Sequence, residues 1–236
     1  LTLGAVKNGE TKIVPENFEK PFMSWLENIK DWCISRQIWW GHRLPVFFCQ
    51  KKTAISNDKL LITKTEEFTV AIEKPKKCPF CSNCVMEQVP DVLDTWFSSA
   101  LWPFAGIDKE DLKEFYPSSV LITARDIINL WVGRMIFSGM EFMGSAPFLK
   151  TLIHGTILTK DGKRMSKSLG TGIDPLVLIE KYGADATRFG IIWQAMGNQD
   201  IRWDEASVLA GKKFANKIWN AARFVIGRNG NPSTGS

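Results

Sequence analysis

The chain has 236 residues, of which 44% are hydrophobic and 23% charged, so it is long enough and apolar enough to bury a real core. Its 30 Lys and Arg residues against 25 Asp and Glu residues give a net charge of +5, which suits a nucleic-acid partner without requiring one. We find no apolar run of about 18 residues and no secretory leader, so we expect a soluble cytoplasmic protein that neither crosses nor binds a membrane.

The first predicted elements are a hairpin and a helix. Two short runs between Val6 and Ile13 flank Asn8-Gly9, a pair typical of a type I′ hairpin turn. Downstream, apolar residues recur with the i, i+3, i+4, i+7 spacing of one buried helix face. They are Phe22, Trp25, Leu26, Ile29, Trp32 and Cys33.

Cysteines mark the next region. Cys49 ends an apolar run, and Cys78, Cys81 and Cys84 follow after a lysine-rich stretch. A Cys-x-x-Cys turn aims two thiolates at one point, and zinc takes four such ligands. We therefore expect a structural zinc site, with Cys49 as the expected fourth ligand. The alternative is a set of reduced structural thiols.

Two β-branched runs predict parallel strands at 119–123 and 149–154, with a helix of about four turns between them, from Ile127 to Phe142. Ligands of parallel sheets bind beyond the carboxyl ends of the strands. That rule predicts a site at 123–126 and 154–156.

A basic loop leaves the second of these strand ends. Its centre reads Lys163-Arg164-Met165-Ser166-Lys167-Ser168, with glycines on both sides. Cations, hydroxyls and glycines together are typical of a mobile loop that neutralises phosphates. A solvated basic loop without function is the alternative.

Three helices are predicted after the loop. Asp174-Pro175 is an N-cap and first-turn pair that starts a helix ending at Gly183, and a second helix starts at Asp185. The last helix is predicted from 205 to 227. Its buried face is expected to hold Val208, Leu209, Phe214, Ile218, Ala221, Ala222 and Val225.

The run from Arg164 to Ser168 resembles the KMSKS signature of the class I aminoacyl-tRNA synthetases, with arginine in place of the first lysine. Residues 31–37, 39–45 and 91–99 resemble segments of the valine, isoleucine and leucine enzymes, in the same order. The Trp-Trp-Gly-His-Arg variant at 39–43 is most similar to the valine enzymes. The resemblance runs from about residue 18 to 224.

This resemblance implies an α/β fold: the second half of a Rossmann-like parallel sheet, with a small zinc-ribbon-like insertion and a C-terminal helical stem. It divides the chain into 1–46, 47–90, 91–183 and 184–236. Neither the editing domain nor the His-x-Gly-His signature is found. We therefore expect a fragment that follows the editing insertion and does not activate valine alone.

The reaction implied is activation of valine with ATP and Mg²⁺, followed by transfer to tRNA, by a whole enzyme that we expect to be monomeric. Residues that match the family's motifs receive four roles. The implied catalytic residues are Lys167 and Arg164. The implied ATP-binding residues are Asp126, His154, Gly155, Ser166, Lys167 and Ser168. The implied valine-binding residues are Trp96, Asp126, Ile127 and Trp131. The implied zinc ligands are Cys49, Cys78, Cys81 and Cys84.

Several alternatives stay open. Asp126 could face the substrate ammonium or the ribose hydroxyls, and Trp96 and Trp131 could be plain core residues. The parent protein could be an isoleucine or leucine enzyme, or a non-catalytic tRNA-binding module derived from a synthetase. The basic face of the last helix could contact the tRNA backbone or simply be solvated.

Overall fold

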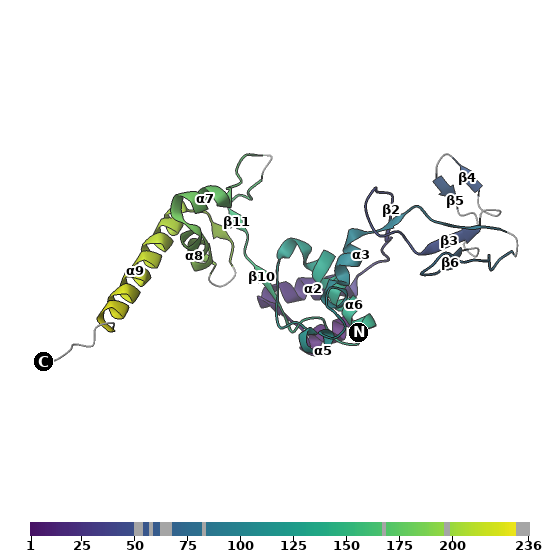
Figure 1. Ribbon diagram of the computed structural model, residues 1–236, viewed down its shortest axis with the longest axis horizontal. Helices are drawn as coiled ribbons and strands as arrows, with labels where there is room; N and C mark the ends of the chain where they lie inside the picture. Colours follow the sequence, from purple (N-terminus) through teal and green to yellow (C-terminus); the bar gives the residue numbers. More distant parts are fainter. Residues whose placement is uncertain are drawn as a thin grey trace. The chain divides into compact units, whose positions relative to one another are not determined.

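The computed structural model describes residues 1–49, 54–56, 59–61, 68–81, 84–166, 169–195 and 199–229 (Figure 1). The chain forms two compact units. The first contains Leu1–Glu10, Phe22–Ser118 and Asn129–Leu149, and the second contains Thr11–Pro21, Ser119–Ile128 and Lys150–Ser236. The predicted division into four consecutive segments stays a prediction. No helix in the described part of the chain is long and apolar enough to cross a bilayer.

The second unit contains a parallel three-stranded sheet in the order β1-β10-β9. Its strands are β1 (Lys12–Val14), β9 (Leu121–Ala124) and β10 (Lys150–His154). Both predicted strands are thus confirmed, as is their parallel pairing. The other elements of this unit are η1 (Glu16–Phe18), η3 (Arg125–Ile127), β11 (Ile157–Leu158), α7 (Pro175–Tyr182), α8 (Ala184–Gln194), β12 (Ile201–Arg202) and α9 (Glu205–Asn229).

The first unit combines short helices with antiparallel strands. Strand pairs β2-β8 and β4-β5 accompany a three-stranded sheet in the order β6-β3-β7. The helices are α1 (Thr2–Lys7), α2 (Glu19–Glu27, which begins in the second unit), α3 (Thr95–Ala100), α4 (Trp102–Ala105), α5 (Leu112–Phe115), η4 (Ile128–Val132, whose first residue belongs to the second unit) and α6 (Gly133–Phe142). The strands are β2 (Ser35–Arg36), β3 (Val46–Cys49), β4 (Ala54–Ser56), β5 (Lys59–Leu61), β6 (Phe68–Val70), β7 (Met86–Gln88) and β8 (Val92–Leu93). The predicted α/β class with a parallel sheet is therefore confirmed.

The N-terminal hairpin prediction is wrong. Val6 is buried in helix α1, and Asn8 and Gly9 end that helix. The Asn8 N–H donates to the Gly4 carbonyl at 2.8 Å, and Gly9 adopts a left-handed φ of 77°. An Asn-Gly pair serves a helix end as well as a hairpin turn, because both need a residue with positive φ.

The predicted helix over 22–33 is only partly correct. Helix α2 ends at Glu27, where the Asn28 side chain donates to the Ser24 carbonyl at 2.7 Å. Trp32 and Cys33 therefore lie outside the helix. Trp32 instead packs against Phe97, a tertiary contact that its helical spacing did not reveal.

The three helices after the loop begin at or within one residue of the predicted positions, but only part of the predicted buried face of α9 is buried. Asp174 caps α7, accepting from the Leu176 N–H at 2.9 Å. Helix α9 packs closely on α8 at Gly190 and Gly211, where an added Cβ would lie 2.7 Å from backbone atoms. Val208 is buried as predicted, but the other predicted core residues of α9 remain exposed among the described residues: Leu209, Phe214, Ile218, Ala221, Ala222 and Val225. Phe214 is partly covered, because its ring stacks on Phe189 of α8. Helix α8 has 11 residues against 25 in α9, so it covers only the first turns.

Candidate active-site elements and cysteine cluster

Strands β9 and β10 end at the same edge of the sheet. Ala124 is paired with His154, the last residue of β10. Asp126 and Gly155 follow directly, so the residues expected at one strand edge do lie there. His154 is exposed, and its Nδ1 lies 2.8 Å from the Gly155 carbonyl. A substrate at this edge could reach backbone groups of both strand ends.

Gly155 is required by a close approach of two backbones. A Cβ at this position would lie only 2.0 Å from the Gln199 carbonyl oxygen. The neighbouring Thr156 N–H donates to Asp200 Oδ1 at 2.8 Å, and Asp200 also pairs with Arg125 beyond β9. Asp200 thus joins both strand ends, a role that the sequence analysis missed because Asp200 lies 44 residues beyond Thr156.

The first part of the basic loop folds back on itself. The Thr159 N–H donates to the Lys163 carbonyl at 2.7 Å, and Arg164 bridges back to Leu158. Arg164 also forms an ion pair with Asp126, although its side chain remains 70% exposed. Exposed pairs of this kind contribute about 0–1 kcal/mol, so Asp126 holds Arg164 only weakly.

The second part of the loop is closed by a polar contact. The Ser166 N–H donates to Thr171 Oγ1 at 2.9 Å, and the Thr171 N–H donates to the Ser166 carbonyl at 3.2 Å. The predicted residues Lys167 and Ser168 lie outside the described residues. The loop therefore has a fixed base at Ser166 and Thr171.

Trp96 and Trp131 line one cavity of about 570 Å³ in the first unit, together with Ser98, Ser99 and Trp102. The Trp131 Nε1–H donates to the Ser99 carbonyl at 3.1 Å, which fixes its indole against helix α3. The two predicted tryptophans are thus brought together. Asp126 and Ile127, which share their predicted role, belong to the second unit.

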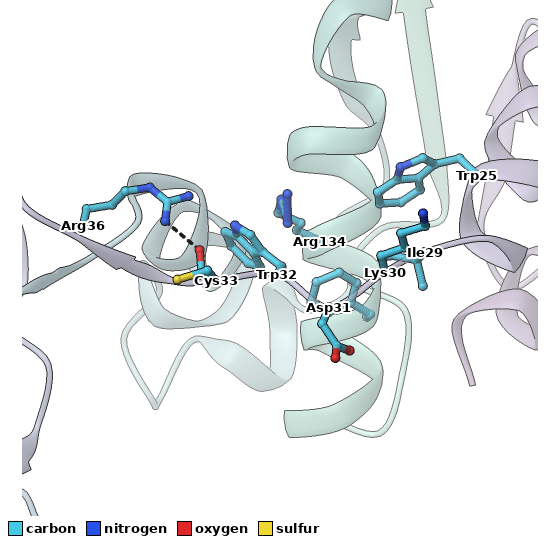
Figure 2. A pocket seen from close by; sticks show the side chains of 9 residues that line it. Trp25, Ile29, Lys30, Asp31, Trp32, Cys33, Arg36 and Arg134 are labelled. Atoms are coloured by element: carbon cyan, nitrogen blue, oxygen red, sulfur yellow. Dashed lines mark hydrogen bonds between the residues drawn. The ribbon is translucent and has the colours of Figure 1, made fainter. Parts of the chain in front are cut away.

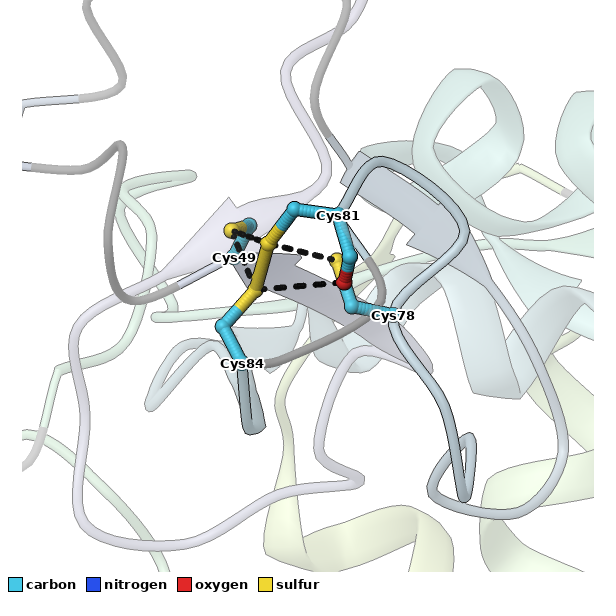
Figure 3. Close-up of side chains that lie close together, drawn as sticks. All are labelled: Cys49, Cys78, Cys81 and Cys84. Atoms are coloured by element: carbon cyan, nitrogen blue, oxygen red, sulfur yellow. Dashed lines mark hydrogen bonds between the residues drawn. A yellow bond between two sulfur atoms is a disulfide. The ribbon is translucent and has the colours of Figure 1, made fainter.

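The four predicted cysteine ligands converge (Figure 3). The sulfur atoms of Cys49, Cys78, Cys81 and Cys84 all lie within 4.8 Å of one another. Cys49 ends strand β3 and, like Cys78, is buried. In this structure Cys81 and Cys84 form a disulfide, which the sequence analysis did not predict.

The donor set fits a zinc ion. Ligands 2.3 Å from a tetrahedral zinc lie about 3.8 Å from one another. The Sγ atoms of Cys49 and Cys81 are 3.6 Å apart, and those of Cys78 and Cys81 are 3.9 Å apart. The Sγ atoms of Cys49 and Cys84 are closer, at 3.0 Å, and Cys84 is bonded to Cys81 in this structure. Zinc takes thiolates, so its binding requires the Cys81–Cys84 pair to be reduced. Cys33 is exposed and lies outside the cluster.

A second network that the sequence analysis missed surrounds a cavity of about 600 Å³ in the first unit (Figure 2). Arg36 forms an ion pair with Asp94, and the Arg134 guanidinium lies 3.6 Å from the centre of the Trp32 ring. Burial lowers the pKa of Arg134, while Asp94 raises it and Arg36 lowers it further. Arg36 and Asp94 are 58 residues apart, and no local pattern links them.

A family model described as tRNA synthetases class I (I, L, M and V) matches residues 2–204, most of the chain. The chain belongs to the class I tRNA synthetases. Among curated relatives, the valine–tRNA ligase of Clostridium tetani is 52% identical to this synthetase chain over 225 residues, which are 94% of this chain. That of Thermus thermophilus is 46% identical over 95%. The chain spans about a quarter of each relative, 24% and 26% respectively.

Solved structures show the same fold at low sequence identity. The LeuRS of Agrobacterium radiobacter, solved in a ternary complex with tRNA and LeuAMS, matches with a TM-score of 0.63 and 22% identity. It covers 86% of this chain and 31% of its own. The methionyl-tRNA synthetase of Mycobacterium tuberculosis, solved with methionyl-adenylate, matches with a TM-score of 0.60 and 18% identity over 89% of this chain and 34% of its own.

Proposed function

We propose that the protein containing this chain is a cytoplasmic, monomeric valine–tRNA ligase. It would activate valine with ATP to form valyl-adenylate and pyrophosphate, then transfer the valyl group to tRNA. The observation that carries this proposal is the 52% identity to a valine–tRNA ligase across 94% of the chain. The Trp-Trp-Gly-His-Arg segment at 39–43 supports valine over isoleucine and leucine.

The basic loop would act on the leaving pyrophosphate. In-line attack of the valine carboxylate on the α-phosphate places growing negative charge on that group, and nearby cations stabilise it. Lys167 would supply the main charge and Arg164 would assist. Arg164 is weakly held by Asp126 and mostly exposed, so it can exchange that carboxylate for a phosphate.

ATP would bind at the shared edge of β9 and β10. Asp200 holds the turn after β10 in place through the Thr156 N–H, and the nucleotide would lie against His154 and Gly155 at this strand end. Ser166 and Ser168 would donate to phosphate oxygens from the loop. Asp126 would accept from the ribose hydroxyls or pair with the valine ammonium, and Mg²⁺ would accompany ATP as its counterion.

Valine would bind against the tryptophan-lined cavity. Trp96 and Trp131 present apolar ring surface beside few polar groups, which suits a short branched side chain. Ile127, which belongs to the second unit, keeps the valine-binding role that the family resemblance implies for it. The cysteine cluster would hold a structural zinc that stabilises the β6-β3-β7 sheet.

The test is amino-acid-dependent exchange between ATP and pyrophosphate, assayed on the full-length protein with valine, isoleucine or leucine. We expect the highest kcat/KM with valine. Higher kcat/KM with isoleucine or leucine would reassign the substrate. Salt-sensitive tRNA binding, without ATP–pyrophosphate exchange in the presence of any of these amino acids, would instead support a non-catalytic tRNA-binding module derived from a synthetase.

The same assay on this 236-residue chain alone should give no exchange above background. The chain spans only about a quarter of its relatives, and the His-x-Gly-His segment of the family is missing from it. Losing several oriented phosphate donors at once should cost more than losing any single contact. Valine-dependent exchange by the chain alone would contradict this expectation.

A further inference from the structure

Helix α3 is a short element that depends on its surroundings. It has six residues, Thr95–Ala100, and isolated helices of that length are unstable in water. It nevertheless carries Trp96 and Ser99, which line the tryptophan cavity. The position of the cavity wall is therefore set by whatever holds α3.

Asp94 joins the N-terminus of α3 to Arg36, with one carboxylate oxygen bound to each. Oδ1 accepts from the Trp96 N–H at 2.8 Å and caps the helix. Oδ2 accepts from Arg36, and the Asp94 side chain is only 9% exposed. Arg36 Nη1 also donates to the carbonyls of Cys33 at 2.6 Å and Ser35 at 2.8 Å. One carboxylate thus ties α3 to residues 33–36.

Arg134 supports the same helix from α6. Its guanidinium lies 3.6 Å from the centre of the Trp32 ring (Figure 2). Trp32 in turn packs against Phe97 of α3, with the two ring centroids 6.2 Å apart. The Arg134 side chain is nine-tenths buried, and no described group accepts a hydrogen bond from its Nε. Arginine stays charged in proteins, and Asp94 is the carboxylate that favours this charge.

The other end of α3 is joined to the second tryptophan of the cavity through the Trp131 bond to the Ser99 carbonyl. A shift of α3 would therefore alter the position of Trp96 relative to Trp131. Arg36, Asp94 and Arg134 are not among the residues that line that cavity. Their effect on it would act through α3.

We infer that Arg36, Asp94 and Arg134 are positioning residues that set the amino-acid selectivity of the enzyme by fixing α3. The inference rests on the proposed function, because it assigns the tryptophan cavity to the amino-acid side chain. An apolar pocket separates substrates that differ by one methylene by about 10- to 200-fold. If α3 shifts, the cavity wall shifts with it, and part of this discrimination between amino acids is lost.

The test uses Asp94→Asn in the full-length protein. Asparagine is as good an N-cap as aspartate and has nearly its volume, so this variant removes the charge and keeps the cap. In valine-dependent exchange we expect the KM for valine to rise about 10-fold and the preference for valine over isoleucine to fall about 10-fold. The KM for ATP and the kcat should change by less than about 3-fold, because none of the proposed ATP-binding residues belongs to α3.

Two further variants complete the test. Arg36→Lys keeps a cation beside Asp94 and should restore most of the selectivity that Arg36→Gln loses. Lys30→Gln is the matched control: it removes a cation that lines the same cavity as Arg36 but forms no hydrogen bond or ion pair with the described residues of α3, and it should behave as wild type. The inference would be overturned if Asp94→Asn and Arg36→Gln both kept the wild-type KM for valine and the wild-type preference for valine over isoleucine. If Asp94→Asn does not fold, the Arg36 pair decides.

Amide hydrogen exchange separates this inference from the proposed function. In the chain itself, residues 95–100 should exchange faster in Asp94→Asn than in wild type, and Lys30→Gln should not differ. Wild-type protein without valine activity would refute the proposed function while leaving this structural result to stand. Unchanged exchange at 95–100 would refute the positioning of α3 whatever the substrate.

Discussion

The cysteine cluster and the basic loop are built in opposite ways. The cluster brings four sulfur atoms within 4.8 Å of one another, and Cys49 is completely buried at the end of a paired strand. The loop presents Arg164 with 70% of its side chain exposed, held by one surface ion pair. Fixed, buried ligands suit an ion that stays in the folded protein. Weakly held cations suit a negative charge that appears only during a reaction.

The most severe change to the fixed site is removal of its metal. Reduced, purified chain should contain about one zinc, and Cys78→Ser should contain much less, because a three-thiolate site binds zinc more weakly. Structural zinc contributes about 10–16 kcal/mol in small zinc-finger peptides. A chelator should therefore expose the region from 49 to 90 to proteases before the rest of the chain.

Cys33→Ser is the matched control for zinc content, since Cys33 lies outside the cluster. It should retain the full zinc content. If the reduced chain contained no zinc and the region from 49 to 90 still resisted proteases, the zinc proposal would be contradicted. The cysteine cluster would then no longer contrast with the basic loop as a fixed ion site.

The loop is tested by Lys167→Ala in the full-length protein. The rate of valyl-adenylate formation should fall about 10²-fold or more, with little change in valine affinity, because the contact is strongest in the transition state. Stopped-flow or exchange kinetics would measure this. Lys160→Ala, at an exposed lysine earlier in the same loop, is the control and should lose far less. An effect confined to KM would argue against a transition-state role.

Gly155→Ala tests whether the turn after strand β10 is rigid. An added Cβ would lie 2.0 Å from the Gln199 carbonyl, so one backbone segment must move. We expect a loss of about 1–3 kcal/mol in the free energy of unfolding, measured by urea denaturation. Gly172→Ala is the control, because its Cβ would meet no atom of a described residue within 4 Å. Equal stability of the two variants would show that the turn yields easily.

The smallest expected effect concerns Glu205, at the start of α9. Hydrogen bonds from Lys181 and Tyr182 lower the pKa of this carboxyl. Its contribution to stability is therefore complete above its ordinary value of about 4.5 and is lost as the pH falls toward the lowered folded value.

Thermal unfolding between about pH 6 and pH 3 checks this difference. Wild type should lose slightly more stability than Glu205→Gln over that range, because only wild type must protonate a carboxylate held by two donors. Glu180→Gln, at an exposed position of α7, should follow wild type. If the stability of wild type and Glu205→Gln fell in parallel over this pH range, the Glu205 carboxylate would make no such contribution.

Local chemistry in the sequence was sufficient for several features. The Asp174-Pro175 pair predicted the start of α7, because a cap bond spans only two residues. The β-branched runs predicted β9 and β10, and the cysteine spacing predicted that Cys78, Cys81 and Cys84 lie close together. The resemblance around Arg164 predicted the family, which the comparisons confirm. The roles assigned to individual site residues stay predictions.

Tertiary structure decided what distant residues do to one another. The convergence of Cys49 on the knuckle was expected, but the pairing of Arg36 with Asp94 and of Arg125 with Asp200 was not. Such contacts join residues that are 58 and 75 positions apart, and they form only once strands and helices have packed. Helical spacing likewise extended α2 to residue 33, because periodicity records apolar positions and not the element against which they pack. Sequence determined which residues could form caps, ligands and strands, whereas long-range packing determined which of them meet.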